Sequence, residues 1–132
     1  MLTLDTARAL AASGILWEPQ AGDRFAIAQQ ELAGEVYWIS ELTIEVHHYE
    51  DQTILGFNGT TEWALDSVPL EVALWLPRED QLRELIGDRL LGLRRTGTGW
   101  EVTIAADGRS TAYEAIDAEE AYAAALLAIA GT

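Results

Sequence analysis

The sequence predicts an α+β fold with largely antiparallel sheet, on three observations. Apolar residues recur every three or four positions near both ends of the chain, which is typical of amphipathic helices. Between these segments lie two runs rich in alternating apolar and polar residues, the pattern of half-buried strands. Asn58-Gly59 and Asp107-Gly108 are dipeptides typical of tight turns between strands. With 132 residues, the chain is expected to form a single domain over residues 1–132.

The first part of the chain predicts one helix and one short strand. Residues 4–13 have apolar side chains at helical spacing, with Thr3 as a candidate N-cap and Gly14 as a candidate stop. Residues 17–23 contain Pro and Gly and are expected to form a loop. The strand candidate follows at residues 24–28.

Residues 35–57 change to a period of two and predict an antiparallel meander. Three runs within it, at 36–39, 43–49 and 53–57, are rich in β-branched and aromatic residues. Residues 60–76 hold many apolar side chains without one clear period. Short helical turns or irregular structure are therefore expected there.

The last third of the chain predicts two helices around a three-stranded meander. Pro77 suits the first position of a helix that runs to Ile86. Asp117 with Glu120 resembles a capping box that opens a second helix, which continues to Ala130. The strands expected between the helices are residues 89–95, 100–105 and 109–116.

Charge narrows the range of partners. The formal net charge is −14, and all eight basic residues are arginine, because the chain has no lysine. Residues 25–77 carry nine carboxylates and no basic side chain. Nucleic-acid affinity depends on neutralising phosphates, so no nucleic acid is expected as a partner. The acidic middle is either a solvated face that aids solubility or a docking face for a basic protein. An inhibitor that mimics nucleic acid would need the carboxylates of residues 31–71 arrayed on one face.

Composition also excludes several chemistries. Without cysteine there is no disulfide, thiolate catalysis or cysteine-ligated zinc. Without lysine there is no P-loop or Schiff-base chemistry, and the glycines of residues 97–99 lead into a strand and not into a helix. We therefore expect no enzyme activity, no catalytic residues and no cofactor. The N-terminus lacks a secretory pattern and the longest apolar run, residues 121–130, is too short to span a membrane, so a cytoplasmic protein is expected.

One pattern has the residue types of a partial metal site. Adjacent strand residues point to opposite faces, so His47 and His48 cannot share a metal, whereas Glu45 and His47 lie on one face with Asp51 nearby. The alternative is one exposed and one partly buried histidine without a ligand, and no metal site is predicted. The alternative function, a small-molecule enzyme or ligand sensor, would have a pocket near His47 or near the arginines at 89, 94 and 95.

Tryptophan and arginine suggest where contacts could form. Four tryptophans sit in apolar patterns and are expected in the core: Trp38, Trp63, Trp75 and Trp100. Trp17 lies in a loop and is expected to be exposed as an anchor. The arginines at 89, 94 and 95, near those of the 77–86 helix, form the one basic concentration. They are a counterpart to the acidic middle, an anion site, or unrelated surface residues.

Three segments resemble a known group of proteins. They are residues 16–23, residues 56–66 and residues 73–82, which read LWEPQAGD, GFNGTTEWALD and ALWLPREDQL. They resemble a family of small uncharacterised proteins from high-GC bacteria, and the resemblance covers the whole chain. Members often carry the name pilus-assembly protein, which belongs to a nucleotide-binding ATPase. This chain lacks the size and the phosphate loop for that activity, and the resemblance brings no catalytic residues.

The sequence therefore favours a non-enzymatic acidic protein that binds or regulates through protein–protein contacts. A homodimer formed through sheet edges is a further possibility. Where Trp17, Trp63 and Trp75 meet, they would line a groove for a peptide or small ligand. The candidate interaction residues are Trp17, Glu45, His47, Glu50, Asp51, Trp63, Arg94 and Arg95.

Overall fold

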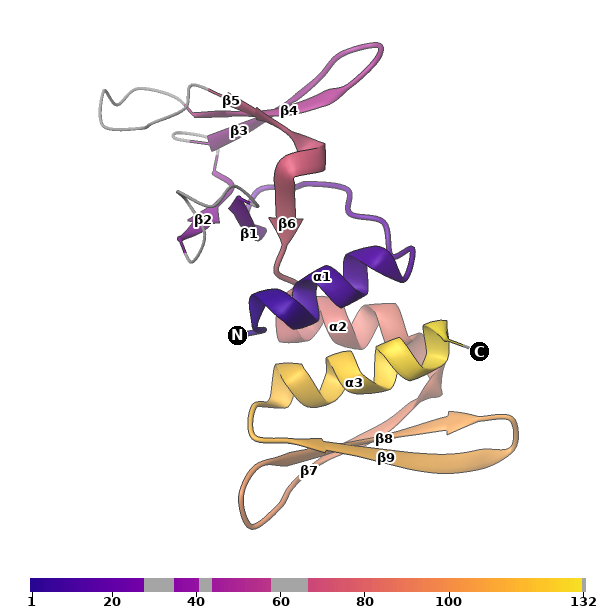
Figure 1. Cartoon of the computed structure of the whole chain (residues 1–132). Helices are drawn as coiled ribbons and strands as arrows, with labels where there is room; N and C mark the ends of the chain where they lie inside the picture. Colours follow the sequence, from indigo (N-terminus) through magenta and orange to yellow (C-terminus); the bar gives the residue numbers. More distant parts are fainter. Residues whose placement is uncertain (28–34, 41–43, 58–66, 132) are drawn as a thin grey trace. The chain divides into compact units, whose positions relative to one another are not determined.

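The computed structural model describes residues 1–27, 35–40, 44–57 and 67–131, and these belong to two compact units. Unit 1 comprises Met1–Ile15 and Pro77–Thr132, and unit 2 comprises Leu16–Leu76. Along the chain, helices occur near the N-terminus, in the middle and near the C-terminus, and the strands fall between them in the sequence (Figure 1). All the strand pairs in the described residues are antiparallel. The predicted α+β fold is confirmed.

Unit 1 packs three helices with one sheet. The helices are α1 (Leu4–Ala12), α2 (Glu79–Ile86) and α3 (Ala118–Ala130). A 3₁₀ turn, η3 (Gly87–Arg89), leads into the sheet, whose strand order is β7-β8-β9. α3 contacts β8, β9, α1 and α2, so it forms the centre of the unit. The strands are β7 (Leu90–Arg95), β8 (Trp100–Ala106) and β9 (Arg109–Ala115).

The core of unit 1 follows from its apolar patterns. Val102 and Ile104 alternate along β8 on the face that meets α3, and both are buried. On α3, small alanines let the helix lie close to its neighbours, while Tyr122 and Leu126 fill the remaining volume.

In the described part of the chain, no helix has the length and apolar character needed to cross a membrane.

One predicted helix start and one predicted capping box need correction. α2 begins at Glu79, and Pro77 lies ahead of the N-cap residue Arg78, which is extended with ψ 165°. The Arg78 amide donates to Gln81 Oε1 at 2.9 Å, so Gln81 fixes the start of this helix. At α3, Asp117 caps the helix as expected. The predicted capping box is wrong in its second half, because the Glu120 carboxylate accepts from Thr6 Oγ1 of α1 at 2.7 Å.

The described residues of unit 2 form two small sheets. The first has strand order β2-β1-β6 and the second β3-β4-β5. A 3₁₀ turn, η2 (Leu70–Val72), stands between β5 and β6, so one segment joins the two sheets. The strands are β1 (Arg24–Ile27), β2 (Val36–Trp38), β3 (Ile44–His48), β4 (Thr53–Phe57), β5 (Ser67–Pro69) and β6 (Ala73–Trp75).

The expected strand pairing of residues 35–57 is only partly correct. β3 and β4 pair as predicted, with Val46 opposite Leu55, but β2 pairs with β1 in the other sheet. The irregular structure expected for residues 60–76 also contains two short strands, β5 and β6. Each is three residues long, which is too short for a period of two to be read from the sequence. Asn58-Gly59 lies outside the described residues.

Candidate functional site

The hairpin β3–β4 carries four of the predicted interaction residues. Glu45 and His47 lie on one face of β3, as the alternation predicts, with Glu45 Oε2 and His47 Nε2 3.9 Å apart. Both side chains are 40% exposed. His48 points away from them and its Nδ1 lies 3.3 Å from Thr53 Oγ1 across the strand pair. The two histidines therefore occupy separate environments.

A glycine on the neighbouring strand makes room for His47. Gly56 of β4 lies opposite Glu45 and is buried. A Cβ placed on Gly56 would come within 2.8 Å of His47 Cδ2 and Nε2. The imidazole thus lies over the backbone of β4, and this position keeps it beside Glu45.

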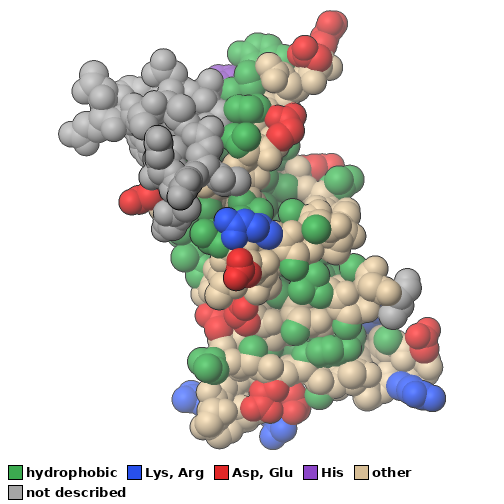
Figure 2. Space-filling view, viewed as in Figure 1, with side chains coloured by type: hydrophobic (Ala, Val, Ile, Leu, Met, Phe, Trp, Pro, Cys, Tyr) green, Lys and Arg blue, Asp and Glu red, His purple; other side chains and the backbone are tan. Residues whose placement is uncertain are grey.

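The tip of the same hairpin is acidic and open to solvent. Glu50 and Asp51 occupy the turn, which is closed by a hydrogen bond from the Tyr49 amide to the Gln52 carbonyl at 2.9 Å. Both acidic residues are exposed. Figure 2 shows acidic side chains in red at this tip, which lies at the top of the view. Glu50 and Asp51 are therefore available for contact with a partner.

Trp17 does not have the exposed position expected of it. Its indole Nε1 donates to Asp23 Oδ2 at 2.9 Å, and the same oxygen accepts from the Gln20 amide at 3.1 Å. Its ring stacks on Trp75, with centroids 6.1 Å apart and an interplanar angle of 5°. Trp17 is half-buried and packs against the core cluster around Phe25. A carboxylate in the loop fixes it there, and such a contact is not visible in apolar periodicity.

Among the described tryptophans of unit 2, Trp38 is the exposed one. It was expected in the core, but it is 51% exposed. The reason is that β2 is at the edge of its sheet. Trp38 pairs with Arg24 of β1, and the Arg24 guanidinium lies 5.8 Å from the centroid of the Trp38 ring. Trp63, the remaining predicted contact in this unit, lies outside the described residues.

A cavity of about 510 Å³ lies between the loop of residues 17–23 and the hairpin β3–β4 of unit 2. Trp17 and Glu18 line it from the loop, His48 and Thr53 from the hairpin, and Leu70 from η2. A second cavity of about 420 Å³ lies between the same loop and Glu45. Trp17 and Trp75, two of the three tryptophans expected around a groove, meet in a stack, and of these two only Trp17 lines either cavity.

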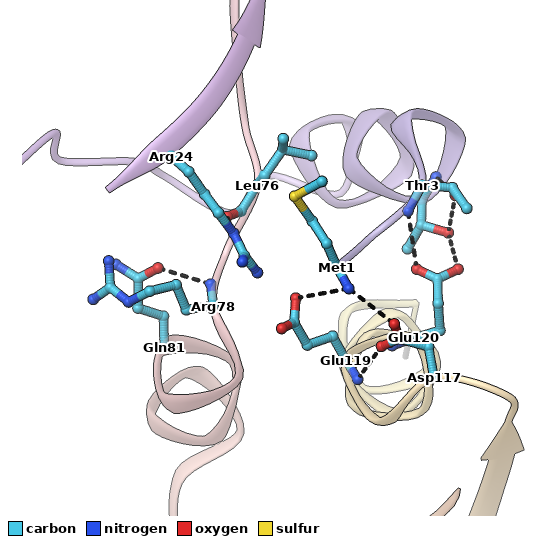
Figure 3. A network of polar contacts seen from close by, with 10 residues as sticks. Met1, Thr3, Arg24, Leu76, Arg78, Gln81, Asp117, Glu119 and Glu120 are labelled. Carbon is cyan, nitrogen blue, oxygen red and sulfur yellow. Dashed lines mark hydrogen bonds and ion pairs between the residues drawn. The ribbon is translucent and has the colours of Figure 1, made fainter. Parts of the chain in front are cut away.

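The surface of unit 2 has almost no positive charge to balance its carboxylates. Residues 16–76 contain eleven carboxylate residues and one arginine. That arginine, Arg24, is 9% exposed, and its Nε donates to the Leu76 carbonyl oxygen at 3.0 Å (Figure 3). Among the acids, Asp23 is buried, whereas Glu18, Glu35 and Glu71 are exposed like those of the hairpin tip. Four further acids of this unit, Glu31, Glu41, Glu62 and Asp66, lie outside the described residues.

Burial and a neighbouring acid also act on Tyr37. Desolvation of its phenol raises the pKa of Tyr37 above the ordinary value, and the negative charge of Glu35 raises it further. The phenol therefore stays neutral well beyond physiological pH. It contributes packing against Phe25, with ring centroids 5.5 Å apart, and adds no charge to this surface.

The predicted basic contacts Arg94 and Arg95 are engaged within unit 1. Arg94 stands opposite Glu101 on β8, and its Nη2 lies 3.1 Å from Glu101 Oε1. The Arg95 guanidinium lies 5.6 Å from the ring centroid of Trp100. Both are exposed, but each already has a partner on the neighbouring strand.

No group of three or more histidine and carboxylate side chains suited to a metal ion occurs within the described residues.

The sequence analysis named Arg89 within the basic concentration, with an anion site as one possibility, but it did not include Arg109, and these two arginines line a cavity in unit 1. The cavity has a volume of about 400 Å³. A signal for it was present, because Arg109, Thr111 and Tyr113 alternate along β9 and therefore share one face of the sheet. Arg89 lies 20 positions earlier in the chain, so no local pattern links it to Arg109.

Comparisons with known proteins add no assignment: the chain matches no family model, no curated protein and no solved structure.

Proposed function

We propose that this chain is an acidic, non-enzymatic binding or regulatory protein that acts through protein–protein contacts. Unit 2 is the part that docks the partner, and the partner presents a basic segment. The observation that carries the proposal is the charge of unit 2, in which eleven carboxylate residues are set against one buried arginine. Mutual repulsion among these carboxylates disfavours the free protein and falls when a cationic surface approaches.

The geometry of the described surface suits such a partner. The exposed acids Glu50 and Asp51 project at the hairpin tip, and Glu18 lines the 510 Å³ cavity beside Trp17 and His48. A lysine or arginine side chain has an apolar stem and a cationic head. Trp17 offers the stem an aromatic surface, and Glu18 offers the head an opposite charge. The cavity is therefore the place where an anchoring basic side chain would enter.

The first experiment measures binding of a short arginine-rich peptide to the full chain by fluorescence anisotropy, with a glutamine-substituted peptide of equal length as the negative control. Two variants separate site from net charge. Glu50→Gln with Asp51→Asn removes two charges at the hairpin tip. Glu84→Gln with Asp88→Asn removes two charges from exposed residues of unit 1. The hairpin variant is expected to bind several-fold more weakly than the unit 1 variant.

Two outcomes of this binding experiment would contradict the proposal. Equal weakening by the two double variants would mean that the peptide responds only to total charge, and unit 2 would not be a docking surface. The same holds if the wild-type chain does not distinguish the arginine-rich peptide from its neutral control at low salt. Once the site is established, capture from the native host with the wild type and the Glu50→Gln/Asp51→Asn variant in parallel identifies the partner.

A further inference from the structure

Unit 1 contains a hollow at the end where α3 stops. Figure 1 shows the C-terminal end of α3 and the turn between β8 and β9 at the same end of this unit. The cavity of about 400 Å³ lies there. Ile104 of β8 and Thr111 of β9, which stand opposite each other, line one side, and Ala128 and Ile129 of the last turn of α3 line another. The apolar side chains in this lining make part of the cavity suitable for a hydrocarbon group.

Arg89 and Arg109 both line this cavity, and within the described residues neither side chain forms a hydrogen bond, an ion pair or a ring contact. Each of the chain's other six arginines has such a contact. Their contacts are Arg8 with Asp5, Arg24 with Leu76, Arg78 with Asp80, Arg83 with Glu79, Arg94 with Glu101 and Arg95 with Trp100. The two arginines without a contact therefore meet at one cavity, in a chain with an excess of carboxylates.

Further donors lie on the same side of the cavity. Thr111 and Tyr113 follow Arg109 at alternate positions of β9, and both line the hollow. Their hydroxyl groups make no hydrogen bond to other described residues. One carboxylate, Asp107 in the turn before β9, is also in the lining. The charged side chains of the lining thus sum to a single positive charge.

We propose that this cavity binds a small organic monocarboxylate that carries an apolar body. The planar guanidinium group matches a carboxylate with two parallel hydrogen bonds, and hydroxyl donors complete such a site. The charge of the lining matches a monoanion, whereas Asp107 and the net charge of −14 disfavour a dianion such as phosphate. The volume falls in the range of small-molecule sites, about 300–1,000 Å³. The proposal is independent of the docking surface on unit 2.

The test uses benzoate as the probe and benzamide as its neutral counterpart, each titrated into the full ¹⁵N-labelled chain. Benzoate is expected to shift the backbone amide signals of β9 and of the last turn of α3, in a saturable way. Benzamide has the same ring but no charge. It is expected to bind at least about tenfold more weakly than benzoate, because a charge-assisted hydrogen-bonded pair is lost. Inorganic phosphate is titrated as a third probe and is expected to bind more weakly than benzoate.

Variants assign the effect to the two arginines. Arg89→Gln and Arg109→Gln are each expected to weaken benzoate binding by about tenfold. Arg109→Lys keeps the positive charge but loses the planar guanidinium that makes two parallel hydrogen bonds, so the loss of benzoate affinity is expected to be intermediate. Arg94→Gln is the matched control, because it removes the same charge from the same sheet but its contact is with Glu101. It is expected to leave benzoate binding unchanged within about twofold.

Several results would overturn the proposal. One is equal binding of benzoate and benzamide, and another is weakening by Arg94→Gln as large as that by Arg109→Gln. Tighter binding of phosphate than of benzoate would exclude the monocarboxylate class. Signal changes confined to residues away from β9 and α3 would exclude the cavity. Thermal unfolding of each variant, compared with the wild type, confirms that a loss of binding is not a loss of fold.

Discussion

The imidazole of His47 lies over Gly56, in the space that a Cβ on that glycine would occupy. We expect Gly56→Ala to displace the His47 ring and separate it from Glu45, while the fold survives. The ring is the far end of a side chain that is 40% exposed, so it can move into solvent. Reduced chain entropy in the unfolded state stabilises alanine by about 0.4–1 kcal/mol and offsets much of the remaining strain. The net change in unfolding free energy is expected to stay below about 1 kcal/mol.

Proton NMR of the His47 ring measures the displacement. The ring signals are expected to move toward those of a solvent-exposed histidine in Gly56→Ala, and His48 serves as the internal reference. The His47→Ala/Gly56→Ala double variant removes the clash, so it is expected to be at least as stable as His47→Ala alone. A double variant less stable than His47→Ala would mean that Gly56 is needed for a reason other than the imidazole.

Gly99 differs from Gly56 in what surrounds it. A Cβ on Gly99 would collide with the backbone of Ala115 and Ile116, including the Ala115 carbonyl oxygen. Backbone cannot rotate away as a side chain does, so β9 would have to separate from β8 where Trp100 pairs with Ala115. We expect Gly99→Ala to lower the unfolding free energy by more than about 2 kcal/mol.

Gly97 in the same loop is the control for that substitution. Apart from the two adjacent residues of the chain, no atom lies within 4 Å of a Cβ placed there, so Gly97→Ala is expected to change stability by less than about 1 kcal/mol. Urea denaturation of both variants measures the difference. If the two substitutions cost the same, the close approach of Gly99 to Ala115 would not be a constraint on the fold.

The elements that the sequence predicts well are those with a local signal. The helix 118–130 has a capping aspartate and an apolar face, and Asp107-Gly108 forms the expected turn, with Asp107 at φ 53°. Strands β5 and β6 are different, because each has three residues and the 3₁₀ turn between them hides any alternation. Their place is decided by pairing with β4 and β1, which lie elsewhere in the chain.

The candidate site shows the same division. Alternation places Glu45 and His47 on one face of β3, as expected. Burial of tryptophan was predicted less well, because it depends on where a strand lies in its sheet and on single polar contacts. Trp38 is exposed because β2 is an edge strand, and Trp17 is half-buried because Asp23 accepts its indole N–H. The first condition depends on strands that lie elsewhere in the chain, and the second is a polar contact within a loop, which apolar periodicity does not show.

Asp23 is expected to be the acid of unit 2 that matters most for stability. It is 4% exposed, and one of its oxygens accepts from both Trp17 Nε1 and the Gln20 amide. We expect Asp23→Ala to lower the unfolding free energy by about 2–3 kcal/mol, because hydrogen bonds to a charged acceptor are lost. Asp23→Asn keeps an acceptor oxygen and is expected to lose about half as much. Urea denaturation followed by tryptophan fluorescence measures both, and an Asp23→Ala variant as stable as the wild type would contradict the assignment.

Asp117 links the stability of unit 1 to pH. Burial alone would raise the pKa of its carboxyl, but hydrogen bonds from the Met1 amino group and from the Glu119 and Glu120 amides together lower it below the ordinary value. The Met1 nitrogen lies 2.8 Å from Asp117 Oδ2 (Figure 3). Because the pKa is depressed in the folded state, this carboxylate contributes its full stabilisation above the ordinary aspartate pKa. The contribution is lost as pH falls from there through the lower folded-state pKa.

Asp117→Asn tests this linkage, because asparagine still caps a helix but does not titrate. The wild type is expected to be more stable than the variant at about pH 7, and this difference is expected to shrink toward zero at about pH 2. Urea denaturation at a series of pH values measures the difference directly. Asp80 gives the comparison, since a hydrogen bond from the Arg78 side chain lowers its pKa at an exposed position. Asp80→Asn is expected to change stability less at every pH, because solvent screens that pair. A difference for Asp117→Asn that stays constant with pH would show that its carboxyl has the same pKa in the folded and unfolded chain.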